Sequence, residues 1–197
     1  MKLHTNPPGT VDRRKTEMKI VTVGRGTIGG GLAKLWRAAG HEVKELGRDG
    51  GDASDANAVL VAVPGAEISP ALSKVTGLEE KIAIDATNIL PERHGDFPSY
   101  ADEVKSFTHA PVAKSFNMNF GGLFDVVREQ RVRPSNWYVS DEGAREVTEQ
   151  LIRDAGYDPV RVGDLSRARD FENAVWLLMG IQPVGGVFYR FAVPGEL

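Results

Sequence analysis

The feature that most constrains the fold is a glycine-rich turn that joins an apolar segment directly to an amphipathic one. Residues 19–23 have the apolar character of a buried strand, and this segment ends at Gly24. Apolar side chains then recur at helical spacing until Gly40, a residue type that often ends helices. These helical positions are Ile28, Leu32, Leu35, Trp36 and Ala39. A strand, a tight turn and a helix in this order predict the opening unit of an α/β fold.

The turn has the spacing Gly-x-Gly-x-x-Gly, and each glycine has its own physical reason there. It consists of Gly24, Arg25, Gly26, Thr27, Ile28 and Gly29. Gly24 permits the tight turn, Gly26 lets the backbone approach a diphosphate, and Gly29 allows close packing of helix and strand. The helix N-terminus offers free N–H groups and a positive dipole end to phosphates. Although the pattern alone is weak in a chain with 22 glycines, its position between strand and helix predicts a dinucleotide site.

The second predicted strand, 41–46, bears on which dinucleotide fits. Enzymes that use NAD usually have an acidic residue at the end of this strand, where it binds the ribose 2′-hydroxyl. Arg48 follows this strand instead, and a guanidinium can pair with a 2′-phosphate. Arg25 adds a second positive charge, and Thr27 adds a hydroxyl for a phosphate oxygen. The pattern favours NADP(H), but Arg48 could be an ordinary exposed arginine, and Glu45 could serve NAD if the strand ended earlier.

The rest of the chain alternates strand and helix patterns, which predicts a Rossmann-like, doubly wound, mostly parallel sheet in three αβα layers. The continuous apolar run at 58–63 is typical of a strand buried on both faces. Further strands are predicted at 82–84, 111–115, 136–139 and 158–162. Helices are predicted at 141–156, between Asp141 as N-cap and Gly156 as stop, and at 171–180. The last helix is apolar nearly all round, so we expect it in the monomer core or a dimer interface.

Two segments depart from a regular doubly wound chain. About ten residues separate the second strand from the run at 58–63, which is too few for a full crossover helix. We therefore expect that helix to be truncated or absent. Residues 1–17 contain few apolar side chains, two adjacent prolines and a basic triplet, which predicts a flexible N-terminal arm. The remaining residues, 18–197, are predicted to form one dinucleotide-binding domain with C-terminal helices.

Residues that follow the predicted strands are candidates for the site, because such sheets bind ligands outside the carboxyl ends of their strands. Val63 and Pro64 follow one strand, Asn88 follows the next, and Asn117 follows a third. The two asparagines could hydrogen-bond a ribose or a substrate, or they could cap or turn the chain. Neither His94 nor His109 has a carboxylate or metal-ligand partner at a recognisable spacing, so the sequence identifies no acid–base group.

Composition and charge argue against several classes of protein. The chain has no cysteine, which excludes disulfides, thiolate metal sites and cysteine nucleophiles. A net charge of -3 gives no electrostatic case for nucleic acid or anionic membrane as a partner. No apolar run approaches the ~18 residues that span a bilayer, and the N-terminus lacks the apolar core of a secretory signal. We expect a cytoplasmic protein without a metal site.

Short segments spread over most of 18–197 resemble, in their order and spacing, the family of NADPH-dependent reductases of coenzyme F420. They are 24–32 (GRGTIGGGL), 40–43 (GHEV), 48–49 (RD), 60–64 (LVAVP), 84–88 (IDATN), 112–117 (VAKSFN), 164–173 (DLSRARDFEN) and 188–191 (FYRF). The resemblance implies hydride transfer between NADP(H) and a small-molecule acceptor, the deazaflavin F420. We expect either F420 or a flavin as the acceptor of this protein.

The resemblance also implies site residues and an assembly. It assigns Thr27 and Arg48 to the 2′-phosphate, and Ala62, Val63 and Pro64 to the nicotinamide. In this family the two rings stack and hydride passes directly, so little is asked of a protein acid or base, and homodimers form through the C-terminal helices. Two other functions stay open: a sensor that binds NADP(H) without turnover, and a reductase of a small carbonyl or imine.

Overall fold

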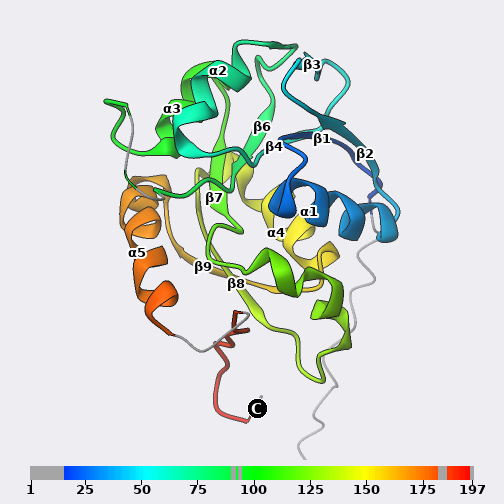
Figure 1. Cartoon of the computed structure of the whole chain (residues 1–197). Helices are drawn as coiled ribbons and strands as arrows, with labels where there is room; N and C mark the ends of the chain where they lie inside the picture. The colour runs from blue at the N-terminus through cyan, green and yellow to red at the C-terminus, as the bar shows by residue number, and fades with distance from the viewer. Residues whose placement is uncertain (1–15, 90–91, 93–94, 182–185, 196–197) are drawn as a thin grey trace, which may run out of the picture.

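A seven-stranded sheet in the order β2-β1-β4-β6-β7-β8-β9 runs through the centre of the protein, with helices on both faces (Figure 1). This computed structural model describes residues 16–89, 92, 95–181 and 186–195. Predictions that concern residues 1–15 of the N-terminal arm, or His94, lie outside the described residues. In the part of the chain that is described, no helix is long and apolar enough to cross a membrane.

The sheet is parallel except for one pair of strands. Its strands are β1 (Lys19–Val23), β2 (Glu42–Leu46), β4 (Ala58–Val61), β6 (Ile82–Asp85), β7 (Val112–Ser115), β8 (Ser135–Ser140) and β9 (Asp158–Gly163). Only β7 and β8 pair antiparallel; β8 and β9 are parallel again. All four residues of β4 are buried, as expected for an apolar run at the centre of a parallel sheet. The predicted doubly wound, mostly parallel sheet is confirmed.

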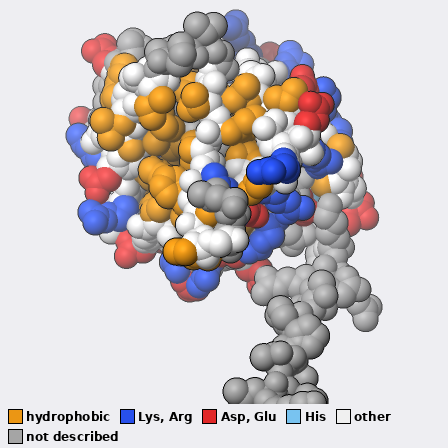
Figure 2. All heavy atoms as spheres, turned by 90° about the horizontal axis from the view of Figure 1, so that it is seen from below, with side chains coloured by type: hydrophobic (Ala, Val, Ile, Leu, Met, Phe, Trp, Pro, Cys, Tyr) orange, Lys and Arg blue, Asp and Glu red, His pale blue; other side chains and the backbone are white. Residues whose placement is uncertain are grey.

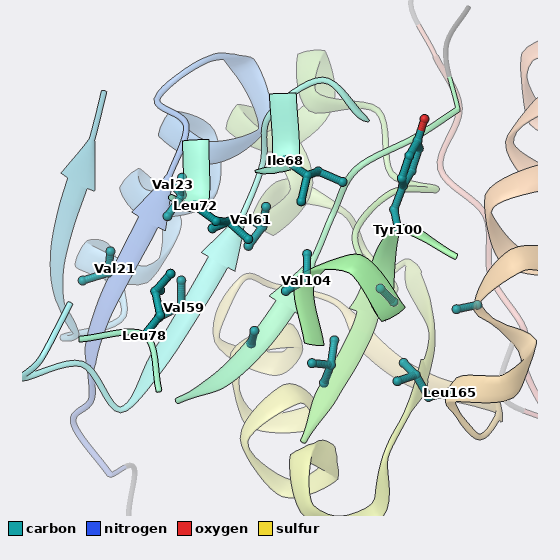
Figure 3. Close-up of a cluster of buried hydrophobic side chains, with 14 of the residues drawn as sticks. Val21, Val23, Val59, Val61, Ile68, Leu72, Leu78, Tyr100, Val104 and Leu165 are labelled. Carbon is teal, nitrogen blue, oxygen red and sulfur yellow. The ribbon is translucent and has the colours of Figure 1, made fainter. Parts of the chain in front are cut away.

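Alternate residues of the strands feed two separate cores, which makes the fold three-layered. Val21, Val59 and Val61 point to the face covered by α2 (Ile68–Leu72), α3 (Tyr100–Thr108) and α5 (Ala168–Gly180) (Figure 3). Ile20 and Leu60 point to the opposite face, which is covered by α1 (Thr27–Ala38) and α4 (Arg145–Asp154). Because successive side chains of β1 and β4 point to opposite faces of the sheet, each helical layer packs against its own set of apolar strand residues.

The connection from β2 to β4 contains no helix, as predicted from its length. In its place β3 (Gly51–Asp52) pairs in parallel with β5 (Val75–Thr76), and the two strands form a small second sheet. Sequence patterning missed this sheet because a strand of two residues shows no alternation of apolar and polar side chains. The second sheet holds the loop after β2 against the segment that follows α2.

One detail of the predicted helices is wrong. Asp141 does not cap a helix with its side chain; its carboxylate accepts hydrogen bonds from Lys105 Nζ (2.8 Å) and Val112 N (2.9 Å), and a 3-10 turn at Glu142–Ala144 precedes α4. Gly156, with φ +100°, does follow α4 as predicted. In the helix predicted over 171–180, Leu177 is 77% exposed, so the monomer core does not enclose the whole helix, and its place in a dimer interface stays a prediction.

Candidate functional site

The three glycines of the turn fit their predicted roles. Gly24 has φ +102°, and a Cβ there would lie 2.3 Å from the carbonyl oxygen of Ala62. A Cβ on Gly29 would lie 1.9 Å from the carbonyl oxygen of Gly24, so the helix meets the strand at a distance that only glycine allows. A Cβ on Gly26 would meet no atom within 4 Å. Gly26 therefore faces open space, the condition for a ligand to approach the backbone.

The N-terminus of α1 is open to an anion. Gly26 is the N-cap residue, and no side chain caps the helix there. The first helical turn, which is fully described, also carries no acidic side chain. Since the first N–H groups of a helix have no partner within it, this end of α1 offers donors and a positive dipole end without a competing carboxylate.

A cleft of about 1070 Å³ lies beside the turn, at the carboxyl ends of β1, β2 and β4. It is lined by Val23, Gly24, Arg25, Gly26, Gly47, Arg48, Asp49, Ala62, Val63, Pro64, Glu67, Pro70, Ala71 and Lys74. A smaller hollow of about 320 Å³ shares part of this wall and extends towards β6. Its lining is Gly26, Thr27, Ile28, Ala62, Val63, Pro64, Ala86, Thr87 and Asn88. The structure thus brings together all the predicted cofactor residues except the buried Gly29, which lies under the turn.

Cationic side chains gather at the β2 end of the cleft. Arg48 lies there, exposed, and Arg25 extends from the turn across Gly47, where an added Cβ would be 3.1 Å from the Arg25 guanidinium carbon. Lys74 completes the group and was not identified from the sequence. Glu45 is not available for a ribose, because it is bound to Arg37 at 2.6 Å and β2 continues to Leu46. The strand therefore does not end before Glu45, the condition under which Glu45 would serve NAD, and the acidic residue that lines this end of the cleft is Asp49.

The two asparagines contact each other. Asn88 Nδ2 donates to the backbone oxygen of Asn117 (2.8 Å), and Asn117 Nδ2 donates to Asn88 Oδ1 (3.2 Å). Asn88 lines the smaller hollow, whereas Asn117 is 5% exposed and reaches the hollow through Asn88. Phe116, just before it, is buried with φ +63°, a conformation that costs energy for a non-glycine residue. A direct contact of Asn117 with substrate stays a prediction.

A charged cluster lies buried next to the smaller hollow and was missed by sequence reasoning. Lys114 Nζ is 2.6 Å from Asp85 Oδ2 and 3.2 Å from Glu172 Oε1, and all three side chains are fully buried. The same ammonium is 3.3 Å from the hydroxyl of Thr87, which lines the hollow. Buried charges are stable only when they are paired. A lysine within the buried strand β7 was the sequence signal that could have revealed the cluster.

Comparison with known proteins finds likeness in structure and not in sequence. No family model and no curated protein matches the chain. A protein of Arthrobacter sp. FB24, described provisionally as an F420-dependent NADP reductase, superposes with a TM-score of 0.71 at 23% identity, over 83% of this chain and 93% of that one. A protein of Sinorhizobium meliloti described only as hypothetical has a TM-score of 0.62 at 20% identity, over 88% of this chain and 93% of that one.

Proteins described as a reductive aminase and an imine reductase are also similar in fold, at 15% identity. A reductive aminase of Aspergillus terreus, solved with NADPH and ethyl levulinate, has a TM-score of 0.59 at 15% identity. It is matched over 84% of this chain and 62% of its own length. The resemblance in fold to the F420-dependent NADP reductases, expected from the sequence, is confirmed, and the protein has the Rossmann-like architecture that these reductases share.

Proposed function

We propose that the protein is an oxidoreductase that binds NADP(H) across the carboxyl ends of β1, β2 and β4. The observation that carries this proposal is the combination of open space at Gly26 with an uncapped helix N-terminus. Together they offer a diphosphate a place where the backbone can be approached and where donors have no other partner. Two proteins of similar fold at lower identity, a reductive aminase and an imine reductase, agree with this class.

The two hollows give the dinucleotide a direction. Arg48 and Arg25 would hold the 2′-phosphate at the β2 end, where their charges favour NADP(H) over NAD(H). Thr27 would donate to a phosphate oxygen, and Ala62, Val63 and Pro64 would form the wall beside the nicotinamide, towards Asn88. Bound NADPH would supply the hydride. The protein would bind and orient the two reactants, which is a large part of catalysis when hydride passes directly between them.

The acceptor that we favour is a deazaflavin such as coenzyme F420, or a flavin. This choice rests on the family segments in the sequence and on the neighbour described as an F420-dependent NADP reductase, whose length the chain covers almost fully. Asn117 would act on the acceptor side through its contact with Asn88. A large flat acceptor stacked on the nicotinamide requires only an open, mostly apolar surface, which Val63 and Pro64 provide.

One observation favours a second candidate, the reduction of a small carbonyl or imine. Such a reaction needs a proton donor near the nicotinamide. Thr87 is one of the residues of the smaller hollow, and its hydroxyl lies 3.3 Å from the ammonium of Lys114, so it could give a proton to the substrate and regain one from Lys114. Imine reductases are also among the proteins of similar fold.

Assembly through the C-terminal helix fits the surface of the protein. On α5 the apolar side chains of Trp176, Leu177 and Met179 are exposed, and Phe191 and Val193 are exposed in the C-terminal segment. Figure 2 shows hydrophobic side chains gathered on the face seen from below. Exposed apolar area of this kind marks contact surfaces. We propose a cytoplasmic homodimer that buries α5, which sedimentation analysis would test by its mass: a monomer at all concentrations would contradict it.

The experiment that separates the candidate functions measures NADPH oxidation by absorbance with each acceptor in turn. F420, FMN and FAD test the favoured activity, and cyclic imines and short ketones test the second. Calorimetric titration with NADP⁺ and NAD⁺ accompanies it. Turnover with a flavin-like acceptor alone would support the favoured function. Binding of NADP⁺ without turnover of any acceptor would favour the function of a sensor that binds NADP(H). Binding of neither nucleotide would contradict the proposal.

A further inference from the structure

We propose that Lys74 is a specificity-determining residue of the cofactor site, and that the small β3–β5 sheet serves to bring it there. This inference rests on the proposed function. The phosphorylated dinucleotide would be selected by a group of three cations, Arg25, Arg48 and Lys74, that comes from three separate segments of the chain. Lys74 precedes β5 and is 26 residues distant from Arg48 in the sequence.

Lys74 is tied to the loop that carries Arg48. Its Nζ donates a hydrogen bond to the backbone oxygen of Arg48 at 3.1 Å. Its own backbone oxygen accepts from the N–H of Gly51, also at 3.1 Å. Directly after Lys74, Val75 pairs with Gly51 in the small sheet. These contacts fix both ends of the lysine, backbone and ammonium, relative to the predicted 2′-phosphate site.

The loop after β2 is shaped around this lysine. Gly50 has φ +74°, and a Cβ on it would lie 2.0 Å from the backbone oxygen of Lys74 and 2.6 Å from the Lys74 Cβ. Only glycine allows the loop to approach the lysine so closely. In a regular doubly wound chain a crossover helix would occupy this part of the connection. Its absence lets the segment after α2 reach the cleft, and that segment carries the third cation.

The charges at this end of the cleft favour the binding of an anion. Within the described chain none of the three cations forms an ion pair with a carboxylate. Asp49 and Glu67 also line the cleft, so the cations outnumber the acids there by three to two. A ribose phosphate carries close to two negative charges at neutral pH, whereas the 2′-hydroxyl of NAD carries none. Lys74 has three N–H donors, of which the Arg48 oxygen takes one, so two remain for phosphate oxygens.

The test compares Lys74→Gln with a matched control, Lys44→Gln. Lys44 is exposed on β2, and its Nζ donates to the backbone oxygen of Asp52 in the same small sheet, but it does not line the cleft. Binding of NADP⁺, NAD⁺, adenosine 2′,5′-bisphosphate and adenosine 5′-monophosphate is measured by calorimetry for each variant. Lys74→Gln is expected to weaken the binding of the two 2′-phosphorylated ligands about tenfold, because it removes a charged hydrogen bond whose strength is reduced by exposure to solvent. The binding of the other two ligands is expected to weaken less than twofold.

Further outcomes decide against the proposal or for it. Equal loss for NADP⁺ and NAD⁺, or no loss for either, overturns the role of Lys74. Retained selectivity in Lys74→Gln together with lost selectivity in Arg48→Gln overturns this inference alone and leaves the proposed function standing. If the unaltered protein binds none of the four ligands, the proposed function fails and this inference with it. Lys74→Arg, which keeps the charge, is expected to recover most of the affinity, and thermal unfolding of each variant checks the fold.

Discussion

Replacing Gly26 by alanine should separate binding from folding. Gly26 has φ −78° and ψ −161°, a conformation that alanine adopts without strain, and its added Cβ would meet no atom of the protein within 4 Å. Gly26→Ala should therefore change the free energy of unfolding by less than about 1 kcal/mol, because the lost freedom of the unfolded chain favours alanine whereas the N-cap position favours glycine. The same methyl group would occupy the space through which a diphosphate approaches the backbone.

The expected loss in binding follows from the hydrogen bonds at risk. If the methyl group displaces the diphosphate from one or two N–H donors of the turn, the cost is about 1.5–3 kcal/mol, or roughly 10- to 100-fold in affinity for NADP⁺. NAD⁺ should lose as much, because the diphosphate is common to both. Calorimetry gives the affinities, and urea unfolding without nucleotide gives the stability.

Gly29→Ala is the matched control, because it should lower the stability of the fold, which Gly26→Ala should leave nearly unchanged. Its Cβ would lie 1.9 Å from the backbone oxygen of Gly24, so helix and strand must separate, and the free energy of unfolding should fall by at least about 1–3 kcal/mol. A Gly26→Ala protein that binds NADP⁺ with unchanged affinity would refute the reasoning. So would a Gly26→Ala protein that is as destabilised as Gly29→Ala.

Three more predictions follow from other contacts. Arg48→Ala should weaken NADPH by about 1–3 kcal/mol and leave NADH nearly unchanged in calorimetry; equal losses would remove Arg48 from the 2′-phosphate site. Lys114→Met leaves Asp85 and Glu172 buried without their cation, so the free energy of unfolding in urea should fall by about 3–5 kcal/mol, and a loss under 1 kcal/mol would contradict the charged cluster. Burial raises the pKa of Glu149, but hydrogen bonds from Tyr138, Arg153 and Arg145 outweigh it and lower the pKa to about 2. A lowered carboxyl pKa stabilises the fold above the unfolded value of 4.5, and this contribution is lost as the pH falls towards 2. Glu149→Gln should accordingly destabilise the protein at pH 7 and much less at pH 2.5, and an equal effect at both would argue against the lowered pKa.

The sequence could predict those parts of the site whose conformation is determined by one continuous segment of the chain. The turn from Gly24 to Gly29 is such a segment, because strand, turn and helix follow one another without interruption and each glycine has a local reason. The position of Arg48 was predictable for the same reason, because only Gly47 separates it from the end of a strand that could be counted from Gly40. The site residues that were missed have partners far along the chain. Lys74 is 26 residues from Arg48, and Lys114 is 29 from Asp85, so no local spacing joins them.

The last helix illustrates why hydropathy alone does not decide burial. In α5 the acidic Glu172 is fully buried, whereas the apolar Leu177 is 77% exposed. Glu172 is held inside because its carboxylate binds the ammonium of Lys114 and the backbone N–H of Tyr100 (2.7 Å). The helix is therefore fixed to the sheet by a charged contact that no count of apolar residues detects. Once that contact sets the rotation of α5, Leu177, five positions after Glu172, lies on another side of the helix and faces outward, and exposed apolar area of this kind is what a dimer interface would require.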